Sequence, residues 1–380
     1  MRAFACNLCG QLLFFENSHC LRCGTAVGLV PELLALTAIE PAPRVSRSSE
    51  VQLKRMRRCA RASLAQCNWL VAEDDPRDLC ASCRLTSAVP HMHADQELRA
   101  FAQAEGAKRR LLYQLIDLGL PIRTRQQDPK RGLTFVLALR SEETPVMTGH
   151  LDGVITLDLS ECDNVHRERL RHAFGEPYRT LLGHFRHEVG HYYWNLLIDG
   201  KAPHAPFRAL FGDERIDYQE ALARNYERGP HTYWADRHVS AYAASHPWED
   251  WAETFAHYLH IRDTLQTSAH FGLRVSPTAH AVPPKGGKLD ARAREEVAEL
   301  DFEQVVSDWL PLTYAFNAVN RSMGKDDLYP FVLAPAVIDK LSFVHDLVRT
   351  VRIDACNVAT EDDPDVEARE SKPPRAASAA

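Results

Sequence analysis

The chain has 380 residues, of which 45% are hydrophobic and 25% are charged, and its formal net charge is −6. These values are ordinary for a globular protein, and the length allows one sizeable core together with small modules. The negative charge disfavours nucleic acid and anionic membranes as partners, and no run of about 18 apolar residues predicts a membrane span.

The N-terminal stretch CNLCGQLLFFENSHCLRCG predicts a zinc ribbon over residues 1–30. Its two Cys-x-x-Cys pairs comprise Cys6, Cys9, Cys20 and Cys23. Each pair offers two thiolates to one tetrahedral zinc, and QLLFFEN between them suits a short hairpin. A peptide this small folds only with the binding energy of a metal, so we expect a structural zinc. The cysteines also interrupt any apolar stretch of a signal peptide, which makes the cytoplasm the expected location.

A second cysteine cluster follows a charged linker that we place at residues 39–58. Its members are Cys59, Cys67, Cys80 and Cys83. We predict a second four-cysteine zinc module over residues 55–90. Only Cys80 and Cys83 have the Cys-x-x-Cys spacing, however, so a simpler alternative stays open. In that alternative, Cys59 or Cys67 is a small buried residue. Four thiolates fill the coordination shell of zinc, so both clusters are predicted to be structural.

Residues 91–356 have the composition of one compact α+β domain that is mainly helical and has a small mixed sheet. Apolar spacing predicts one helix over 95–119, which ends at Gly119, and β-forming residues predict strands at 133–140 and 150–160. Further helices are predicted between 166 and 265, within 292–323 and over 335–351. The charged and then Pro/Ala-rich stretch 357–380 is predicted to be a disordered tail.

The motif His187-Glu188-Val189-Gly190-His191 indicates a catalytic metal site. Residues four apart share one helix face, so His187 and His191 can both face one zinc, with Glu188 placed to deprotonate water. An apolar stripe supports the helix; it comprises Leu182, Phe185, Val189, Tyr192 and Leu196. Gly190 costs about 1 kcal/mol of helix propensity. We therefore expect another element to pass close to the helix at this glycine.

Catalytic zinc needs a third protein ligand, and the best candidate is on a later helix that begins near Pro247. Glu249 and Glu253 share one face of that helix, so Glu249 is the predicted third ligand. Glu253 is predicted to hold a ligand histidine in its proper tautomer. The alternative is that Glu249 and Glu253 form only an exposed acidic face of the helix and bind no metal. Three rival third ligands also stay open, namely Asp213, Glu214 and Asp217. His184 stays open as a possible fourth ligand.

H-E-x-x-H followed about sixty residues later by Glu249-Asp250-Trp251-Ala252-Glu253 resembles the gluzincin metallopeptidases, particularly the lethal-factor type. That type carries E-x-x-A-E on its second helix and a tyrosine seven residues before the ligand glutamate. The resemblance therefore implies that Tyr242 helps to stabilise the transition state. More broadly, the chain is similar to a bacterial family of zinc-binding metallopeptidases with an N-terminal zinc ribbon. Segments from CNLCG to NRSMGKDDLYPFVL carry this similarity, so it spans nearly everything except the tail.

Together these features predict a zinc-dependent peptidase that acts on a peptide or protein substrate. One catalytic zinc would activate water, with Glu188 as general base, and one or two zinc ions would be structural. The strand at 150–160 would align an extended peptide, or would form only a structural hairpin. The competing hypothesis is a binding protein whose zinc ribbons recognise a protein or nucleic acid and whose peptidase-like domain is inactive.

Overall fold

A mixed four-stranded sheet supports one side of the larger part of the molecule. The computed structural model describes residues 2–39, 55–140, 146–174, 180–275, 291–292 and 300–361. The strands are β7 (Thr86–Ala88), β8 (Thr134–Ala138), β9 (Gly149–Leu151) and β10 (Val154–Asp158), in the order β7-β8-β10-β9. β8 is parallel to both β7 and β10, whereas β9 and β10 form an antiparallel hairpin. β9 is therefore an edge strand.

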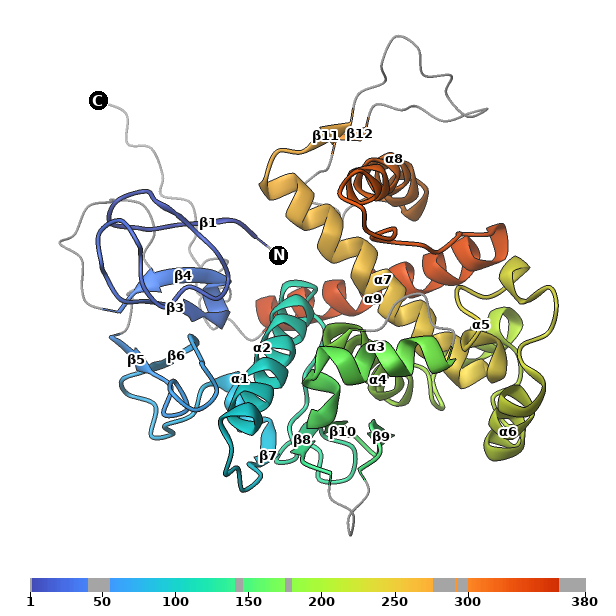
Figure 1. Cartoon of the computed structure of the whole chain (residues 1–380), viewed down its shortest axis with the longest axis horizontal. Coiled ribbons are helices and arrows are strands. Elements are labelled where there is room, and N and C mark those ends of the chain that lie inside the picture. Colours follow the sequence, from blue (N-terminus) through green and yellow to red (C-terminus); the bar gives the residue numbers. More distant parts are fainter. Residues whose placement is uncertain are drawn as a thin grey trace, which may run out of the picture.

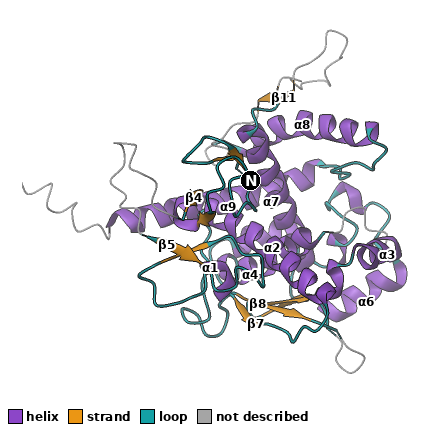
Figure 2. Ribbon diagram, turned by 60° about the vertical axis from the view of Figure 1, so that its left-hand side comes forward, coloured by secondary structure: helices purple, strands orange, loops and turns teal. Residues whose placement is uncertain are grey.

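Helices cover the sheet and make up most of the larger part (Figures 1 and 2). They are α2 (Asp95–Asp117), α3 (Asn164–Phe174), α4 (Leu181–Leu197), α5 (His204–Phe211), α6 (Tyr218–Arg228), α7 (Pro247–His270), α8 (Phe302–Ser322) and α9 (Pro335–Glu361). The larger part also contains the 3-10 turns η2 (Leu159–Cys162), η3 (Trp234–Asp236) and η4 (Ala243–Ser245) and the hairpin of β11 (Arg274–Val275) with β12 (Ala291–Arg292), while the turn η1 (Pro31–Leu33) lies in the N-terminal part. The α+β class with a small mixed sheet is confirmed.

Helices α2 and α4 pack on the same face of the sheet. Phe135 of β8 is fully buried there, with its ring 5.6 Å from the ring of Phe185 on α4. The ammonium group of Lys108 on α2 lies 5.5 Å from the same ring. These contacts fix α4, which carries the H-E-x-x-H motif, directly above the sheet.

Helices α4 and α7 pack tightly against each other at Gly190. The indole nitrogen of Trp251 donates a hydrogen bond of 2.8 Å to the carbonyl of Gly190, and the ring of Tyr193 stacks on Phe255. The backbone of α7 at Ala252 occupies the space that a side chain at residue 190 would need. The expected close approach at Gly190 is thus confirmed, and it brings together the two helices that carry the predicted ligands.

The N-terminal part consists of short hairpins and knuckles on one side of α2 (Figure 1). Its elements are β1 (Phe4–Ala5), β2 (Leu12–Leu13), β3 (Val27–Val30), β4 (Ala35–Ala38), β5 (Met56–Arg58), β6 (Leu70–Ala72) and α1 (Ala81–Arg84). β1 and β2 form a hairpin that encloses the first cysteine pair, whereas the sequence placed a hairpin between the two pairs, where only β2 lies. β5 takes up residues that the sequence placed in the linker, because it pairs with β6. The linker residues 40–54 lie outside the described residues.

The two cysteine modules are joined to each other and to α2. The amide of Leu29 donates to the carbonyl of Asn68 at 2.8 Å, and the Asn68 side chain donates to the carbonyl of Phe15. Arg109 of α2 donates to the carbonyl of Ala65 at 3.0 Å, and Tyr113 of α2 lies edge-on to Phe15. The modules are therefore packed against the larger part through α2.

The predicted helix over 95–119 and the predicted strand at 133–140 agree with α2 and β8, whereas the predicted strand at 150–160 is a hairpin of β9 and β10 that runs into η2. Gly119 has a φ of 69° just after α2, as a helix-ending glycine requires. Part of the predicted helix within 292–323 and most of the predicted tail, residues 293–299 and 362–380, lie outside the described residues, and α9 continues to Glu361. Among the described helices, none combines the length and apolarity needed to cross a membrane.

Candidate metal centres

The first cysteine group has the dimensions of a four-thiolate metal site. Cys6, Cys9, Cys20 and Cys23 each offer a sulfur atom within 4.8 Å of the others. The Sγ atoms of Cys6 and Cys23 are 3.8 Å apart, and those of Cys9 and Cys20 are 3.5 Å apart. Zn–S bonds of about 2.3 Å in a tetrahedron place the sulfur atoms roughly 3.8 Å apart. Gly10 and Gly24, both with a φ of 73°, allow the turn after each pair.

The second cysteine group is more deeply buried than the first. Cys59, Cys67, Cys80 and Cys83 lie within the same 4.8 Å limit, and all four are buried, whereas Cys23 of the first group is exposed. The Sγ atoms of Cys67 and Cys80 are 3.6 Å apart. The structure thus brings Cys59 and Cys67 into the group, which disfavours their interpretation as isolated buried residues. Cys83 lies in α1, directly before β7 of the sheet.

The third group joins the H-E-x-x-H helix to α7. His187 and His191 on α4 and Glu249 on α7 each offer one ligand atom within 4.8 Å of the others. The Nε2 atom of His187 is 3.0 Å from Oε2 of Glu249, and Nε2 of His191 is 3.5 Å from Oε1. Oε2 is buried and has no aligned hydrogen-bond donor among the described residues. An orphaned carboxylate oxygen beside two imidazole nitrogens is a donor set that suits zinc.

Glu253 fixes the orientation of His187. Its Oε1 atom is 2.7 Å from Nδ1 of His187, and its Oε2 atom accepts a hydrogen bond of 2.6 Å from Ser240. Burial opposes ionisation of Glu253, but the hydrogen bond and charge of His187, together with His257 and the hydrogen bond from Ser240, outweigh it and lower the pKa of Glu253 to about 2. A proton held at Nδ1 leaves the lone pair of Nε2 directed at the metal position.

Glu188 and Tyr242 adjoin the same group. Burial raises the pKa of Glu188, and His187 and His191 oppose that rise. A carboxylate with a raised pKa is a better proton acceptor near neutral pH. The ring of Tyr242 lies 5.9 Å from that of His187, and burial raises the pKa of Tyr242, so its hydroxyl stays protonated as a donor.

Three aromatic residues at this group were not found from the sequence. Tyr218 donates a hydrogen bond of 2.8 Å to Oε1 of Glu249, the Trp248 ring lies 3.9 Å from that of His191, and His150 of β9 stacks on His191 at 6.1 Å. Tyr218 directly follows Asp217, and the three carboxylates at residues 213–217 are the stronger metal-ligand signal in that segment. No sequence signal connects the His150 strand to the motif helix.

The rival ligands are engaged elsewhere. Asp213 pairs with Arg215 at 2.7 Å, and Glu214 accepts a hydrogen bond from Arg208. Asp217 accepts a hydrogen bond from the amide of Glu220 and so caps α6. His184 lies 2.6 Å from Glu161, outside the metal group. These contacts favour Glu249 over every alternative.

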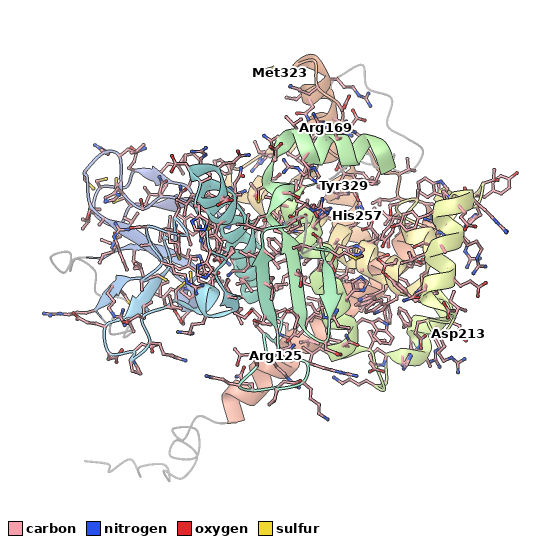
Figure 3. All side chains as sticks on the ribbon, turned by 60° about the horizontal axis from the view of Figure 1, so that its bottom comes forward. Arg125, Arg169, Asp213, His257, Met323 and Tyr329 are labelled. Atoms are coloured by element: carbon pink, nitrogen blue, oxygen red, sulfur yellow. The ribbon has the colours of Figure 1, made fainter. Side chains whose placement is uncertain are left out.

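The segment NRSMGKDDLYPF, residues 320–331, supports α7 from behind the site. The hydroxyl of Tyr329 and Nδ1 of His257 are 2.7 Å apart and buried, and Figure 3 shows the two side chains together. The ring of Phe331 lies 4.3 Å from that of His257. His257 is one turn after Glu253, so this segment holds the part of α7 that orients His187.

Comparison with known protein families shows which family the chain belongs to. Residues 97–347 match the family described as "Putative zinc-binding metallo-peptidase", and residues 3–94 match a zinc-ribbon domain. The chain belongs to this metallo-peptidase family. The resemblance to bacterial metallopeptidases with an N-terminal zinc ribbon is thereby confirmed, and the family descriptions and the two cysteine groups together support zinc binding.

Relatives of similar length occur in mycobacteria. Uncharacterized proteins of Mycobacterium bovis and Mycobacterium tuberculosis are 50% identical to this chain over 355 residues, which cover 93% of this chain and 97% of each relative. No solved structure matches the chain. The similarity to these relatives thus extends through both the zinc-ribbon region and the metallo-peptidase region.

Proposed function

We propose that this protein is a zinc-dependent metallopeptidase with a gluzincin-type site. His187, His191 and Glu249 would hold the catalytic zinc, and the eight clustered cysteines would hold two structural zinc ions. The observation that carries the proposal is the arrangement of Glu249, whose buried Oε2 lies 3.0 Å from Nε2 of His187 without an aligned hydrogen bond. Three protein ligands leave one coordination position for chemistry.

The residues around this group suit hydrolysis of a peptide bond. Zinc, when bound, supplies Lewis acidity that polarises a carbonyl and makes nearby water more acidic. Glu188 accepts the proton of the attacking water and passes it to the leaving amine, a role worth typically 10²–10⁴ in rate. Tyr242, protonated because of its burial, donates a hydrogen bond to the oxygen that gains negative charge. One such donor contributes roughly 3 kcal/mol.

The edge strand β9 favours an extended peptide as substrate. β9 pairs only with β10 in the described sheet, so its outer edge can form backbone hydrogen bonds with another chain. His150 in its centre stacks on His191, which places this edge beside the proposed zinc. Leu151 is 74% exposed and would contact a substrate side chain.

The test combines metal counting with cleavage of a mixed peptide library. Glu188→Gln should keep the zinc content of the wild type and lose at least about 100-fold in cleavage rate. His187→Ala should lose one zinc per chain and all cleavage. Glu303→Gln, an exposed change on α8, is the matched control. A wild-type protein with full zinc that cleaves nothing would instead support a binding protein with an inactive domain.

A further inference from the structure

Tyr218 contacts Glu249 from an element that carries none of the predicted site residues. It is the first residue of α6, and its hydroxyl donates a hydrogen bond of 2.8 Å to Oε1 of Glu249. Neither the H-E-x-x-H motif nor the paired glutamates of α7 account for this contact.

The two oxygen atoms of Glu249 therefore have different surroundings. Oε1 accepts from Tyr218 and lies 3.5 Å from Nε2 of His191. Oε2 lies closer to a histidine, 3.0 Å from Nε2 of His187, and has no aligned donor. A hydrogen bond from a hydroxyl draws electron density from the oxygen that accepts it and makes that oxygen the weaker ligand.

Tyr218 is held in place by the residues that begin α7. Its ring packs edge-on against His246 at 5.2 Å and against Trp248 at 5.8 Å. His246 caps α7 through a hydrogen bond from the amide of Trp248 and contacts the carbonyl of Ile216 at 3.2 Å. The hydroxyl of Tyr218 thus has a fixed position relative to Glu249, as an orienting group requires.

We propose that Tyr218 is a positioning residue that restricts Glu249 to binding the metal through Oε2 alone. This inference rests on the proposed zinc site. A glutamate that binds through both oxygen atoms would fill the position that water and the substrate carbonyl need. Tyr218 keeps that position open by engaging Oε1, and it therefore acts on the metal geometry rather than on the substrate.

The experiment compares Tyr218→Phe with the wild type and with Tyr314→Phe, a change at an exposed tyrosine of α8. Phenylalanine keeps the ring packing and removes only the hydroxyl. A mild chelator first removes zinc that is not bound by thiolates, and one equivalent of cobalt(II) is then added. His187→Ala provides the spectral blank. Cobalt absorption, metal affinity, kcat and KM are measured for each protein.

Tyr218→Phe should weaken the visible absorption of cobalt, because five-coordinate cobalt absorbs less strongly than four-coordinate cobalt. Metal affinity should change by roughly 10-fold, and kcat should fall by roughly 10- to 100-fold with little change in KM. An unchanged cobalt spectrum together with an unchanged affinity overturns the inference. A wild type that binds cobalt but cleaves no peptide defeats the proposed peptidase activity, while the spectral comparison still decides the role of Tyr218. Equal cobalt binding by His187→Ala overturns both proposals.

Discussion

The position that a Cβ atom would take at Gly190 is 3.0 Å from the Cα atom of Ala252 and 3.2 Å from its carbonyl oxygen. Both neighbours are backbone atoms of α7, so they cannot turn aside as a flexible side chain would. The separation between α4 and α7, and with it the distance from His187 to Glu249, therefore depends on a missing side chain at residue 190.

Gly190→Ala should consequently push the two helices apart. We expect a loss of about 1–3 kcal/mol in the free energy of unfolding, as for other overpacked sites, and a lower affinity for the catalytic metal. Gly106→Ala is the matched control, because Gly106 lies inside α2 with no atom nearer than 3.8 Å. That change should stabilise by about 0.5–1 kcal/mol. Urea unfolding and metal titration measure both effects, and equal responses of the two variants would contradict the explanation.

The parts of the site that could be predicted from the sequence are those set by local spacing. His187 and His191 share a face because a helix repeats every 3.6 residues, and Cys80 and Cys83 meet because a knuckle brings residues three apart together. The helix that carries Glu249 could be found because Pro247 and the apolar pattern mark its start. These relations need no knowledge of the tertiary path.

The rest depended on how distant segments meet. Tyr218 reaches Glu249 only because α6 packs beside the start of α7, and His150 reaches His191 only because β9 is the edge strand above which α4 lies. Asp213 stayed open as a rival to Glu249 in the sequence, because its ion pair with Arg215 depends on the local fold. Residue type and local period cannot distinguish such cases.

Glu253→Ala should lower the affinity of the proposed catalytic site for zinc by roughly 10- to 100-fold, since His187 loses the partner that orients its ring. Glu253→Gln should have a smaller effect, because the amide oxygen still accepts from Nδ1. Zinc competition titrations measure the zinc affinities of the wild type, Glu253→Gln and Glu253→Ala, which should fall in that order. Equal affinities for Glu253→Ala and the exposed control Glu303→Ala would show that the 2.7 Å contact does not orient His187.

If each cysteine group holds one zinc ion, as proposed, chelation should remove the two ions at different rates. Cys23 is exposed and Cys9 is partly exposed, whereas all four cysteines of the second group are buried. A chelator should therefore strip the first group faster, and loss of the second metal should also loosen β7, which follows Cys83 directly. A chromophoric chelator follows the release, and hydrogen exchange follows β7. Cys23→Ser should abolish only the fast phase of zinc release. If the fast phase persists in this variant, it comes from the second cysteine group and not from the first.

His257 predicts a fall in stability at mildly acidic pH. Burial lowers its pKa from 6.5 to about 4, although Glu253 opposes this. Above pH 6.5 the imidazole of His257 is neutral in both the folded and the unfolded chain. Below pH 6.5 this imidazole binds a proton in the unfolded chain but stays neutral in the folded chain, so the free energy of unfolding falls as pH falls. The loss is about 1 kcal/mol between pH 7.5 and pH 5.5. His257→Gln should reduce this dependence in urea unfolding, whereas the exposed control His91→Gln should leave it unchanged.

Lys340 and Asp250 form a buried ion pair that ties α9 to α7. The ammonium group donates to Oδ2 of Asp250 and to the carbonyl of Arg237, both at 2.6 Å, and the two charged side chains are 4% and 1% exposed. Lys340→Met would leave the carboxylate buried without its partner, which should cost about 3–5 kcal/mol of stability.

The cost of Lys340→Met should also depend on pH. Burial already raises the pKa of Asp250 to about 7 although Lys340 opposes it, so loss of the ammonium group raises this pKa further. The folded variant then holds a proton that the unfolded chain releases, and its stability falls as pH rises. Unfolding by urea should therefore show a larger deficit at pH 8 than at pH 5.5, and adding Asp250→Asn should remove that difference. A deficit no larger than that of the exposed control Lys325→Met would mean that the ion pair contributes little to the fold.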